Sequence, residues 1–558
     1  MPAAHPQPQP IPIPANFPVK WASPEEAQLP WSRDPMHFPL PLPALEGELW
    51  CRIMQIGFGR AQEAYGMPLR ARARQINNYH FEAMVPAVPL AEMDAQGQRA
   101  GEQIGAAIAR LNELWEGEWL PEIKAHLAWW DAFDLEGADP DGLQRHLDET
   151  VDRVDRLWEL HFRIVLPAYA AMSMFADLYA DLFEGAKALD AYRLLQGFAN
   201  KTLEVNQGLW DLSRQALSSG QVRAALENSE GKELIGALEQ SAEGRAFAGA
   251  LRAFLDTYGQ CGTTWGLTTP TWIEDPAPAL RNLRDHLGRA DSEDPRLHLA
   301  SLAAQREEAV AAARAKLQGY PRQVVEQFEF MLRAGQLGVV LSEDHGFWID
   351  FNAMARVRRV ILAVGRRLVE TGSIAAAEDV FHLELGELRA ALAGGGEQRG
   401  LVAQRQAELE HFRKVEAPRA LGMDYGPPPD NPLTRIFGKL FGGPPPVAAE
   451  AGTLTGHAGS AGVVRGRARV IRTLEEAGRL KLGDILVAET TSPPWTPLFA
   501  TAGGIVTDTG GILSHCAVVA REYRIPAVVG TGAATKVIKE GQLLEVDGDA
   551  GTVRIVEQ

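Results

Sequence analysis

The feature that most constrains the fold of this chain is a break rich in proline and glycine at residues 425–452. The segment reads YGPPPDNPLTRIFGKLFGGPPPVAAEAG, so two runs of three prolines bracket a short piece that is compatible with a helix. Proline runs form stiff spacers, and neighbouring glycines allow the chain to pivot. We therefore expect a hinged linker here, not a packed element, between two parts of different structure.

The part before the linker, residues 46–424, is predicted to be a large helical body. Apolar residues recur there at steps of three and four, which is the spacing of one buried helix face. One such stripe is Val151, Val154, Trp158, Phe162 and Val165, and a second is Phe351, Met354, Val357, Ile361, Val364 and Leu368.

The first 45 residues differ from this body because they are dense in proline. Proline removes a backbone donor and fixes its own φ, which argues against a helix or a central strand. We expect residues 1–45 to form an extended arm over the body or a disordered tail.

The part after the linker, residues 453–558, is predicted to be a small α/β domain. Short β-branched runs alternate there with glycine-rich turns, and one clear helix covers about residues 514–523. The expected fold class is therefore multidomain, with a large, mostly α-helical body followed by a small α/β domain.

Composition and charge exclude several classes of function. The 55 Lys and Arg residues against 72 Asp and Glu residues give a formal net charge of −17. Such a surface repels phosphate backbones and anionic lipids, which argues against nucleic acid or a membrane as the main partner. No apolar run approaches the ~20 residues that a membrane helix needs, and the proline-broken start does not have the pattern of a signal peptide. The three cysteines, Cys51, Cys261 and Cys516, fit neither a disulfide framework nor a zinc site, so we expect a cytoplasmic protein.

The richest local signal is the segment GGIVTDTGGILSHCAVVAREYRIPAVVG at residues 503–530. A buried strand leads into a turn at Gly510 and Gly511, where the absence of side chains lets a ligand approach the backbone. Ser514 is a good N-cap for the helix that follows, which places His515 in a first turn that favours a bound anion. A neutral imidazole there can attack phosphorus and hold the phosphoryl group in a labile N–P bond. The alternative is an ordinary histidine at the start of a helix.

Several neighbours of this histidine are candidate phosphate-binding residues. We expect hydrogen bonds to the phosphoryl oxygens from Thr509, Gly510, Gly511, Ser514 and Arg521.

Residues 459–558 resemble the swivelling phosphohistidine domain of the phosphoenolpyruvate-utilising family, which includes pyruvate phosphate dikinase and rifampicin phosphotransferase. The matching segments are GSAGVVRGRARVI, GDILVAETTSPPWTPLFATAGGIVTDTGG, LSHCAVVARE and IPAVVGTGAAT, in the order of the family. The resemblance implies that His515 carries the phosphoryl group. Leu513 departs from the family, which often has Thr or Ser there, and so removes one phosphate donor. Cys516 stands where a small residue is common, and we expect it to be a small buried side chain.

The resemblance also implies a phosphoryl donor outside this sequence. The sequence contains neither an ATP-grasp domain nor a GxxxxGK[ST] loop. We therefore expect no cofactor bound tightly to this chain, and Mg²⁺ and ATP bound to a separate ATP-grasp subunit. Phenylphosphate synthase, in the same family, divides ATP activation and phosphoryl transfer between chains in this way.

The helical body resembles, more loosely, the acceptor-binding domain of the rifampicin phosphotransferase and phenylphosphate synthase group over most of residues 190–390. The matching segments are QGFANKTLEVNQGLWDLS, FLDTYGQCGTTWGLTTPTWIEDP and LVETGSIAAAEDVFHLELGEL. The densest titratable cluster lies in SEDHGFWID, which has the form of an EDHxxxID motif of this group. We predict His345 as the general base, oriented by Asp344 or Asp350, and Glu343 as an acceptor-binding residue. The alternative is a capping cluster for a helix that starts near Asp350.

Two further residues are candidates for the acceptor site, and we predict no metal ligand in this chain. Arg358, with Arg359 beside it, is predicted to neutralise the phosphate, the alternative being surface arginines on a helix. His80, in NNYHF, is a second acceptor-binding candidate, the alternative being a packed histidine with satisfied hydrogen bonds.

These features together predict a dikinase-type phosphotransferase with paired acceptors. In this hypothesis His515 carries a phosphoryl group from ATP, through the ATP-grasp subunit, to the hydroxyl of a small organic acceptor, which is phenolic by analogy. The alternative is a phosphocarrier or regulatory subunit without a small-molecule acceptor of its own.

Overall fold

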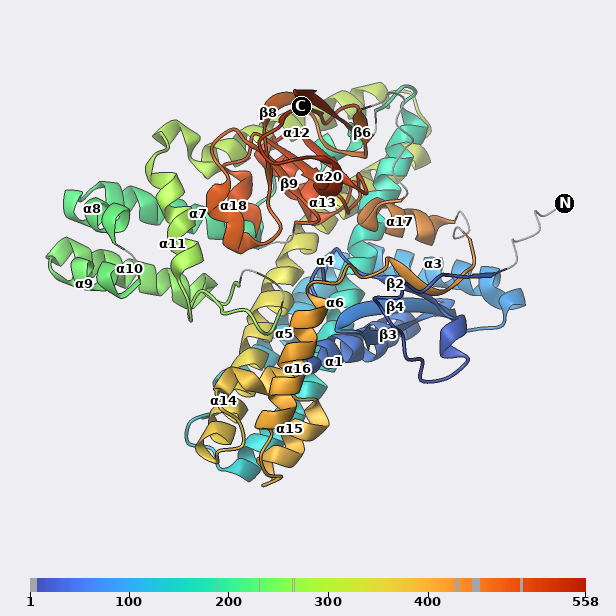
Figure 1. Cartoon of the computed structure of the whole chain (residues 1–558). Helices are drawn as coiled ribbons and strands as arrows, with labels where there is room; N and C mark the ends of the chain where they lie inside the picture. Colours follow the sequence, from blue (N-terminus) through green and yellow to red (C-terminus); the bar gives the residue numbers. More distant parts are fainter. Residues whose placement is uncertain are drawn as a thin grey trace. The chain divides into compact units, whose positions relative to one another are not determined.

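The computed structural model describes residues 8–187, 189–229, 231–262, 264, 266–426, 431–443, 452–491 and 495–557. The chain divides into two compact units, whose elements are coloured along the sequence in Figure 1. Unit 1 contains residues 1–167, 266–268 and 348–434, and unit 2 contains residues 168–265, 269–347 and 435–558. The predicted fold class is confirmed, because a mostly helical body precedes a small C-terminal α/β domain. The predicted body, residues 46–424, contributes to both units.

Unit 1 combines helices with a five-stranded antiparallel sheet in the order β1-β5-β2-β4-β3. The strands are β1 (Gln9–Pro10), β2 (Pro30–Arg33), β3 (Leu69–Ile76), β4 (Tyr79–Pro86) and β5 (Ala420–Asp424). The helices are α1 (Ala44–Arg52), η2 (Ile53–Phe58), α2 (Gly59–Ala64), α3 (Met93–Ala109), α4 (Leu111–Leu114), η4 (Trp115–Trp119), α5 (Leu120–Asp131), η7 (Gly346–Ala353, shared with unit 2), α14 (Met354–Glu370), α15 (Leu385–Leu392) and α16 (Arg399–Phe412). The long helix α6 (Pro140–Leu182) contributes its first part to unit 1.

Both predicted apolar stripes lie on helices. The first stripe lies on α6, and all but the first residue of the second lie on α14, where Val357, Ile361 and Val364 are buried. The period of 3.6 residues thus identified these helices and the faces that they bury.

The expectation that residues 1–45 contain no central strand is wrong. β2 lies inside the sheet, between β5 and β4. Its proline, Pro30, is the first residue of the strand, a position where the missing N–H is tolerated. Trp31 follows and is buried in a core with Phe17 and Phe81, so burial of aromatic side chains stabilises this proline-rich segment.

The helical prediction for residues 46–424 also missed the hairpin of β3 and β4. The two strands are joined at Asn77 and Asn78, whose φ values are 49° and 66°. Asparagine tolerates this left-handed conformation, which two-residue hairpin turns of the primed types require. The pair NN between two alternating runs was the sequence signal for the hairpin.

Unit 2 joins a group of helices to the C-terminal α/β domain. The helices are the second part of α6, α7 (Lys201–Leu217), α8 (Gly220–Asn228), α9 (Gly231–Glu239), α10 (Ala242–Tyr258), α11 (Ala277–Leu287), α12 (Pro295–Lys316), α13 (Arg322–His345) and most of α17 (Pro432–Phe441). The α/β domain contains β6 (Thr453–Thr455), β7 (His457–Ser460), β8 (Val463–Val470), β9 (Ile485–Ala488), α18 (Thr496–Phe499), β10 (Gly504–Thr507), α19 (His515–Tyr523), β11 (Ala527–Val529), α20 (Ala534–Val537), β12 (Leu543–Asp547) and β13 (Thr552–Glu557).

The sheet of the α/β domain has the order β6-β13-β12-β8-β9-β10-β11-β7, with parallel pairs from β8 to β11. Side chains of α19, among them Ala517 and Ala520, share a buried core with Leu486 and Ile505. A second core contains Val506 and Leu544. Because β10 and α19 are both fixed by these cores, the turn between them is held at the C-terminal end of a buried strand.

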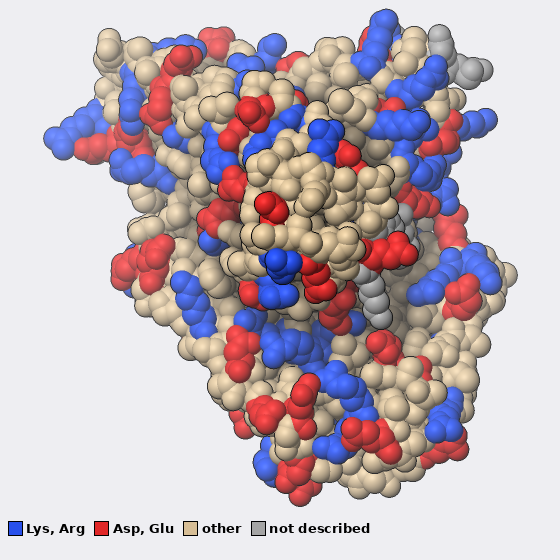
Figure 2. Space-filling view, turned by 90° about the vertical axis from the view of Figure 1, so that its left-hand side faces the viewer, with Lys and Arg blue, Asp and Glu red and all other residues tan. Residues whose placement is uncertain are grey.

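Charge and hydropathy of the surface agree with the composition. Among the described residues, no helix is both long and apolar enough to cross a bilayer. On the face drawn in Figure 2, basic and acidic side chains are interspersed, so the negative net charge is not gathered into one acidic region there.

Candidate functional site

The predicted phosphohistidine, His515, is the first residue of α19. The side chain of Ser514 accepts a hydrogen bond from the backbone N–H of Ala517, which confirms Ser514 as the N-cap of this helix. The side chain of His515 is 13% exposed. The turn therefore presents an imidazole that is accessible but held at a helix N-terminus, where a negative charge is favoured.

Both ring nitrogens of His515 have partners within unit 2. Nδ1 lies 3.3 Å from Oε1 of Glu343, and Nε2 lies 3.2 Å from Oγ1 of Thr496. A carboxylate can only accept, so Nδ1 carries the proton and donates to Glu343. This tautomer leaves the lone pair on Nε2, where the hydroxyl of Thr496 can donate to it. If His515 acts as the predicted nucleophile, the lone pair on Nε2 is the one that can attack phosphorus.

Glu343 is itself fixed by the first turn of α7. Its second oxygen, Oε2, accepts a hydrogen bond of 2.8 Å from the hydroxyl of Thr202, and the side chain is 4% exposed. The next residue, Asp344, accepts a hydrogen bond of 2.8 Å from the backbone N–H of Lys201, and burial raises the pKa of Asp344 to about 6. The sequence motif identified Glu343 as a candidate but did not show that it faces His515. Thr202 and Thr496 lie in segments that resemble the family, but nothing in the sequence marked them as partners of Glu343 or His515.

The turn at residues 510–513, which is predicted to bind phosphate, is hydrogen-bonded through its backbone to the last turn of α17. Three N–H groups of the turn donate to three carbonyl groups of the helix: Gly510 to Phe441 at 3.2 Å, Gly511 to Leu440 at 2.9 Å and Leu513 to Lys439 at 2.7 Å. The Nζ of Lys439 in turn lies 2.7 Å from a carboxylate oxygen of Asp177 on α6. The described part of the linker, residues 431–443, is thus packed, contrary to the expectation of an unpacked arm. The carbonyl groups at a helix C-terminus lack partners within the helix, and the turn supplies them. Residues 427–430 and 444–451 of the predicted linker lie outside the described residues.

The other predicted phosphate donors also have partners in this conformation. The hydroxyl of Thr509 donates to the carbonyl of Glu489. The guanidinium of Arg521 donates to the carbonyls of Ile512 and Gly459, at 2.9 and 3.0 Å, and lies over the ring of Tyr192. Burial lowers the pKa of Arg521 to about 10. Arg521 therefore stabilises the turn at residues 510–513 through its hydrogen bond to Ile512. Its role as a phosphate ligand stays a prediction.

The α/β domain is docked on the helices of unit 2 by apolar side chains. Leu513 and Val518 belong to the same buried cluster as Met172 and Phe175 of α6 and Phe328 of α13. Leu513 is fully buried, which gives a physical reason for its departure from the family pattern. An apolar side chain at this position stabilises docking where a hydroxyl would bind water or phosphate.

A buried carboxylate adds a polar docking contact. Glu522, in the last turn of α19, accepts hydrogen bonds of 3.1 and 3.2 Å from the backbone N–H of Gly197, which precedes α7. The Nε2 of His298 lies 2.6 Å from the backbone carbonyl of Glu522 and donates to it. Burial raises the pKa of Glu522 to about 7, against the opposing effects of the hydrogen bond from Gly197 and the charge of Arg521.

The predicted general base, His345, ends helix α13 and is buried. Its Nδ1 lies 2.7 Å from the carbonyl of Leu341, one turn earlier, so Nδ1 carries the proton there. The chain continues as a helix through η7 into α14, so no helix starts near Asp350 and the alternative of an N-terminal capping cluster is wrong. The role of His345 as a base stays a prediction.

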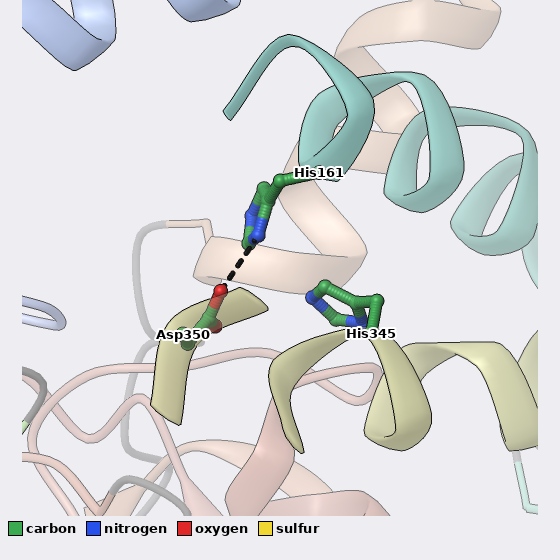
Figure 3. A group of neighbouring side chains, drawn as sticks. All are labelled: His161, His345 and Asp350. Atoms are coloured by element: carbon green, nitrogen blue, oxygen red, sulfur yellow. Dashed lines mark hydrogen bonds and ion pairs between the residues drawn. The ribbon is translucent and has the colours of Figure 1, made fainter. Parts of the chain in front are cut away.

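Asp350 lies in unit 1, where it is bound by a histidine that the sequence did not single out. The Nδ1 of His161, on α6, lies 2.9 Å from Oδ1 of Asp350 (Figure 3). The second oxygen, Oδ2, is buried without a hydrogen-bond partner among the described residues. Asp350 is thus oriented by His161, and Asp344 by the N-terminus of α7.

The two remaining candidates, Arg358 and His80, are buried in unit 1. The guanidinium of Arg358 donates to the carbonyl of Leu267 at 2.7 Å and lies near the ring of Phe381, so Arg358 is not a surface arginine. Arg359 is exposed and therefore fits the alternative of a surface arginine on a helix. His80 contacts Cys51 and Glu82. Their roles in acceptor binding stay predictions.

Comparison with known proteins assigns the two parts of unit 2. Residues 161–343 match the model of the rifampicin phosphotransferase fourth domain, and residues 480–551 match that of the mobile domain of PEP-utilising enzymes. The chain is 40% identical to chondramide synthase cmdD of Chondromyces crocatus, over 98% of this chain and 14% of that protein. It is 32% identical to the prodigiosin synthesizing transferase PigC of Serratia marcescens, over 69% of this chain and 44% of that protein. It is 28% identical to the rifampicin phosphotransferase of Streptomyces sviceus, over 71% of this chain and 44% of that protein.

These matches fall on the elements that meet at His515. The mobile domain supplies His515 and Thr496, and the region that matches the fourth domain supplies Thr202 and ends at Glu343. The match of residues 480–551 identifies this part of the chain as the mobile domain of a PEP-utilising enzyme. The chain belongs to that family and, in its helical part, is similar to rifampicin phosphotransferase. It spans less than half the length of the relatives named above.

Proposed function

We propose that this chain is a phosphotransferase that moves a phosphoryl group on His515 from ATP to the hydroxyl of a small organic acceptor. A separate ATP-grasp subunit, holding ATP and Mg²⁺, phosphorylates His515, and the mobile domain then docks on the helices of unit 2. The observation that carries the proposal is the contact between His515 and Glu343, because it places the histidine against the domain that is similar to part of rifampicin phosphotransferase. A phenolic acceptor is proposed by analogy with phenylphosphate synthase.

The residues around His515 suit both halves of such a reaction. In loading, the lone pair of Nε2 attacks phosphorus, an N–P bond forms and a phosphate–oxygen bond of the donor breaks. The ring then bears the phosphoryl group on Nε2 and a proton on Nδ1, and is cationic. The carboxylate of Glu343, 3.3 Å from Nδ1, stabilises this cation in the docked state.

Unloading reverses the bond changes at Nε2. The acceptor oxygen attacks phosphorus, the N–P bond breaks and the ring leaves as a neutral imidazole that keeps its Nδ1 proton. The proton of the acceptor hydroxyl goes to a base, for which His345 is the candidate, since its Nδ1 proton is held by Leu341 and its Nε2 carries the lone pair. Thr496 donates to Nε2 as the lone pair reappears.

The proposal is tested by a chase of the loaded protein. The chain is labelled with ³²P through ATP and an ATP-grasp protein, freed of nucleotide and mixed with phenols and other small alcohols. We expect label to leave the wild-type protein and appear on one class of acceptor, and to remain on Glu343→Gln. Glu204→Gln is the matched control, because Glu204 pairs with Lys201 in the same region and does not hold His515. Label that passes only to water or to another protein, and never to a small hydroxyl compound, would support the phosphocarrier alternative.

A further inference from the structure

Three residues of unit 1, one of them the acceptor-binding candidate His80, form a hydrogen-bonded chain. The Sγ of Cys51 lies 3.8 Å from Nδ1 of His80, and Nε2 of His80 lies 3.1 Å from Oε1 of Glu82. His80 is fully buried, while Cys51 is partly exposed. A thiol, an imidazole and a carboxylate in this order have the arrangement of a nucleophile, its base and the group that orients the base.

The fold fixes this arrangement through secondary structure. His80 and Glu82 are two apart on β4, so their side chains project from the same face of the strand. Cys51 lies in the last turn of α1, which packs against β3 and β4. The ring of Phe38, 4.8 Å from that of His80, covers the imidazole and keeps water from it.

The protonation state of His80 determines whether its Nδ1 presents a proton or a lone pair to the sulfur of Cys51. Burial alone would lower the pKa of His80, but the hydrogen bonds and charges of Cys51 and Glu82 outweigh burial and raise this pKa to about 10. At neutral pH both ring nitrogens therefore carry protons. Nε2–H donates to Glu82, and Nδ1–H points to the sulfur of Cys51. A donor beside the sulfur can stabilise negative charge that develops on it when Cys51 reacts.

We propose that Cys51 is a modification site, a nucleophilic side chain positioned by His80 and Glu82 that reacts with small electrophiles such as hydrogen peroxide. In that reaction the sulfur attacks one peroxide oxygen, an S–O bond forms and the O–O bond breaks. The released hydroxide takes up a proton and leaves as water, and Cys51 becomes a sulfenic acid, which thiols reduce. The proposal rests on the contacts of Cys51 and does not depend on the predicted role of His80 in acceptor binding.

The other two cysteines provide a contrast within the same molecule. Cys261 and Cys516 are buried, and burial raises the pKa of each to about 12. Neither is therefore expected to react at neutral pH while the protein is folded.

The test is alkylation of the folded chain by iodoacetamide between pH 6 and pH 8, with each cysteine followed by peptide mass spectrometry and glutathione as the reference thiol. We expect Cys51 to react about tenfold faster than glutathione at pH 6.5, with Cys261 and Cys516 unlabelled. Hydrogen peroxide should form a dimedone-reactive product on Cys51, and Cys51→Ser should abolish it.

Two variants distinguish activation of Cys51 by His80 and Glu82 from simple exposure of the thiol. Glu82→Gln keeps the size of the side chain but removes the charge that favours protonated His80, so the alkylation rate of Cys51 should fall toward that of glutathione. Glu63→Gln, an exposed change on α2, is the matched control and should behave as wild type. Circular dichroism confirms that each variant is folded. The proposal is overturned if Cys51 of the folded wild-type chain is unreactive, or if Glu82→Gln reacts as fast as the wild-type chain.

Discussion

Docking of the mobile domain depends on Leu513, and truncation of this side chain should loosen the domain without unfolding it. Leu513 is fully buried in the apolar cluster that α19 shares with α6 and α13. When the mobile domain leaves, this side chain becomes exposed, so its burial contributes about 1.5–3 kcal/mol to the docked state. Removal of most of that contribution in Leu513→Ala should raise the equilibrium constant for undocking by about 10- to 150-fold.

Hydrogen–deuterium exchange followed by mass spectrometry measures this effect directly. In Leu513→Ala the peptides of residues 510–518 and 189–197 should exchange faster by that factor, while β9 and β10 keep their protection. Leu544→Ala is the matched control, because Leu544 is equally buried but lies in the inner core of the mobile domain, where the loss should weaken the whole domain. If Leu513→Ala leaves the two docking peptides unchanged, or accelerates the same peptides as Leu544→Ala, Leu513 is not a docking residue.

Three further changes test other parts of the site. Glu343→Gln should slow transfer from phosphorylated His515 to the acceptor by about 10²–10⁴-fold, because the amide holds the Nδ1 proton less firmly and that proton lets the ring leave as a neutral imidazole. Loading by ATP should proceed, and equal loss of both steps in a rapid-quench assay would contradict this. Thr496→Val removes the hydroxyl beside Nε2 and should slow the same transfer step by about tenfold, and an unchanged single-turnover rate would exclude a role for Thr496. Because burial raises the pKa of Glu522 from 4.5 to about 7, docking should be strongest below pH 4.5 and should weaken as the pH rises to about 7. Hydrogen exchange at residues 510–518, corrected for intrinsic rates, should show this pH dependence in the wild-type chain and lose it in Glu522→Gln. The same pH dependence in Glu522→Gln would refute the prediction.

Much of the fold was predictable from periodicity and from the residues that interrupt it. The helices at residues 140–182 and 354–370 followed from apolar stripes, and the N-cap role of Ser514 followed from residue type and position. The interior strand at Pro30–Arg33 and the hairpin at Asn77 and Asn78 were missed, because proline density and arginine alternation obscured short strands that long-range pairing stabilises.

The candidate site was only partly predictable, for a physical reason. His515 stands in a segment whose local geometry alone favours an anion, so sequence was sufficient to propose it. Its contact with Glu343 joins residues 172 positions apart, and its bond to Thr496 depends on how two elements of the mobile domain pack. The binding of Gly510 and Gly511 by α17 likewise depends on tertiary packing, which residue spacing does not encode.

The central claim, that His515 carries a phosphoryl group, is most directly tested by mass spectrometry of the chain after incubation with ATP, Mg²⁺ and an ATP-grasp protein. The account predicts an acid-labile phosphoryl adduct on the peptide of residues 503–530, on Nε2 of His515, that is absent from His515→Ala. An unmodified His515 under conditions in which the same ATP-grasp protein phosphorylates another residue of this chain would contradict it.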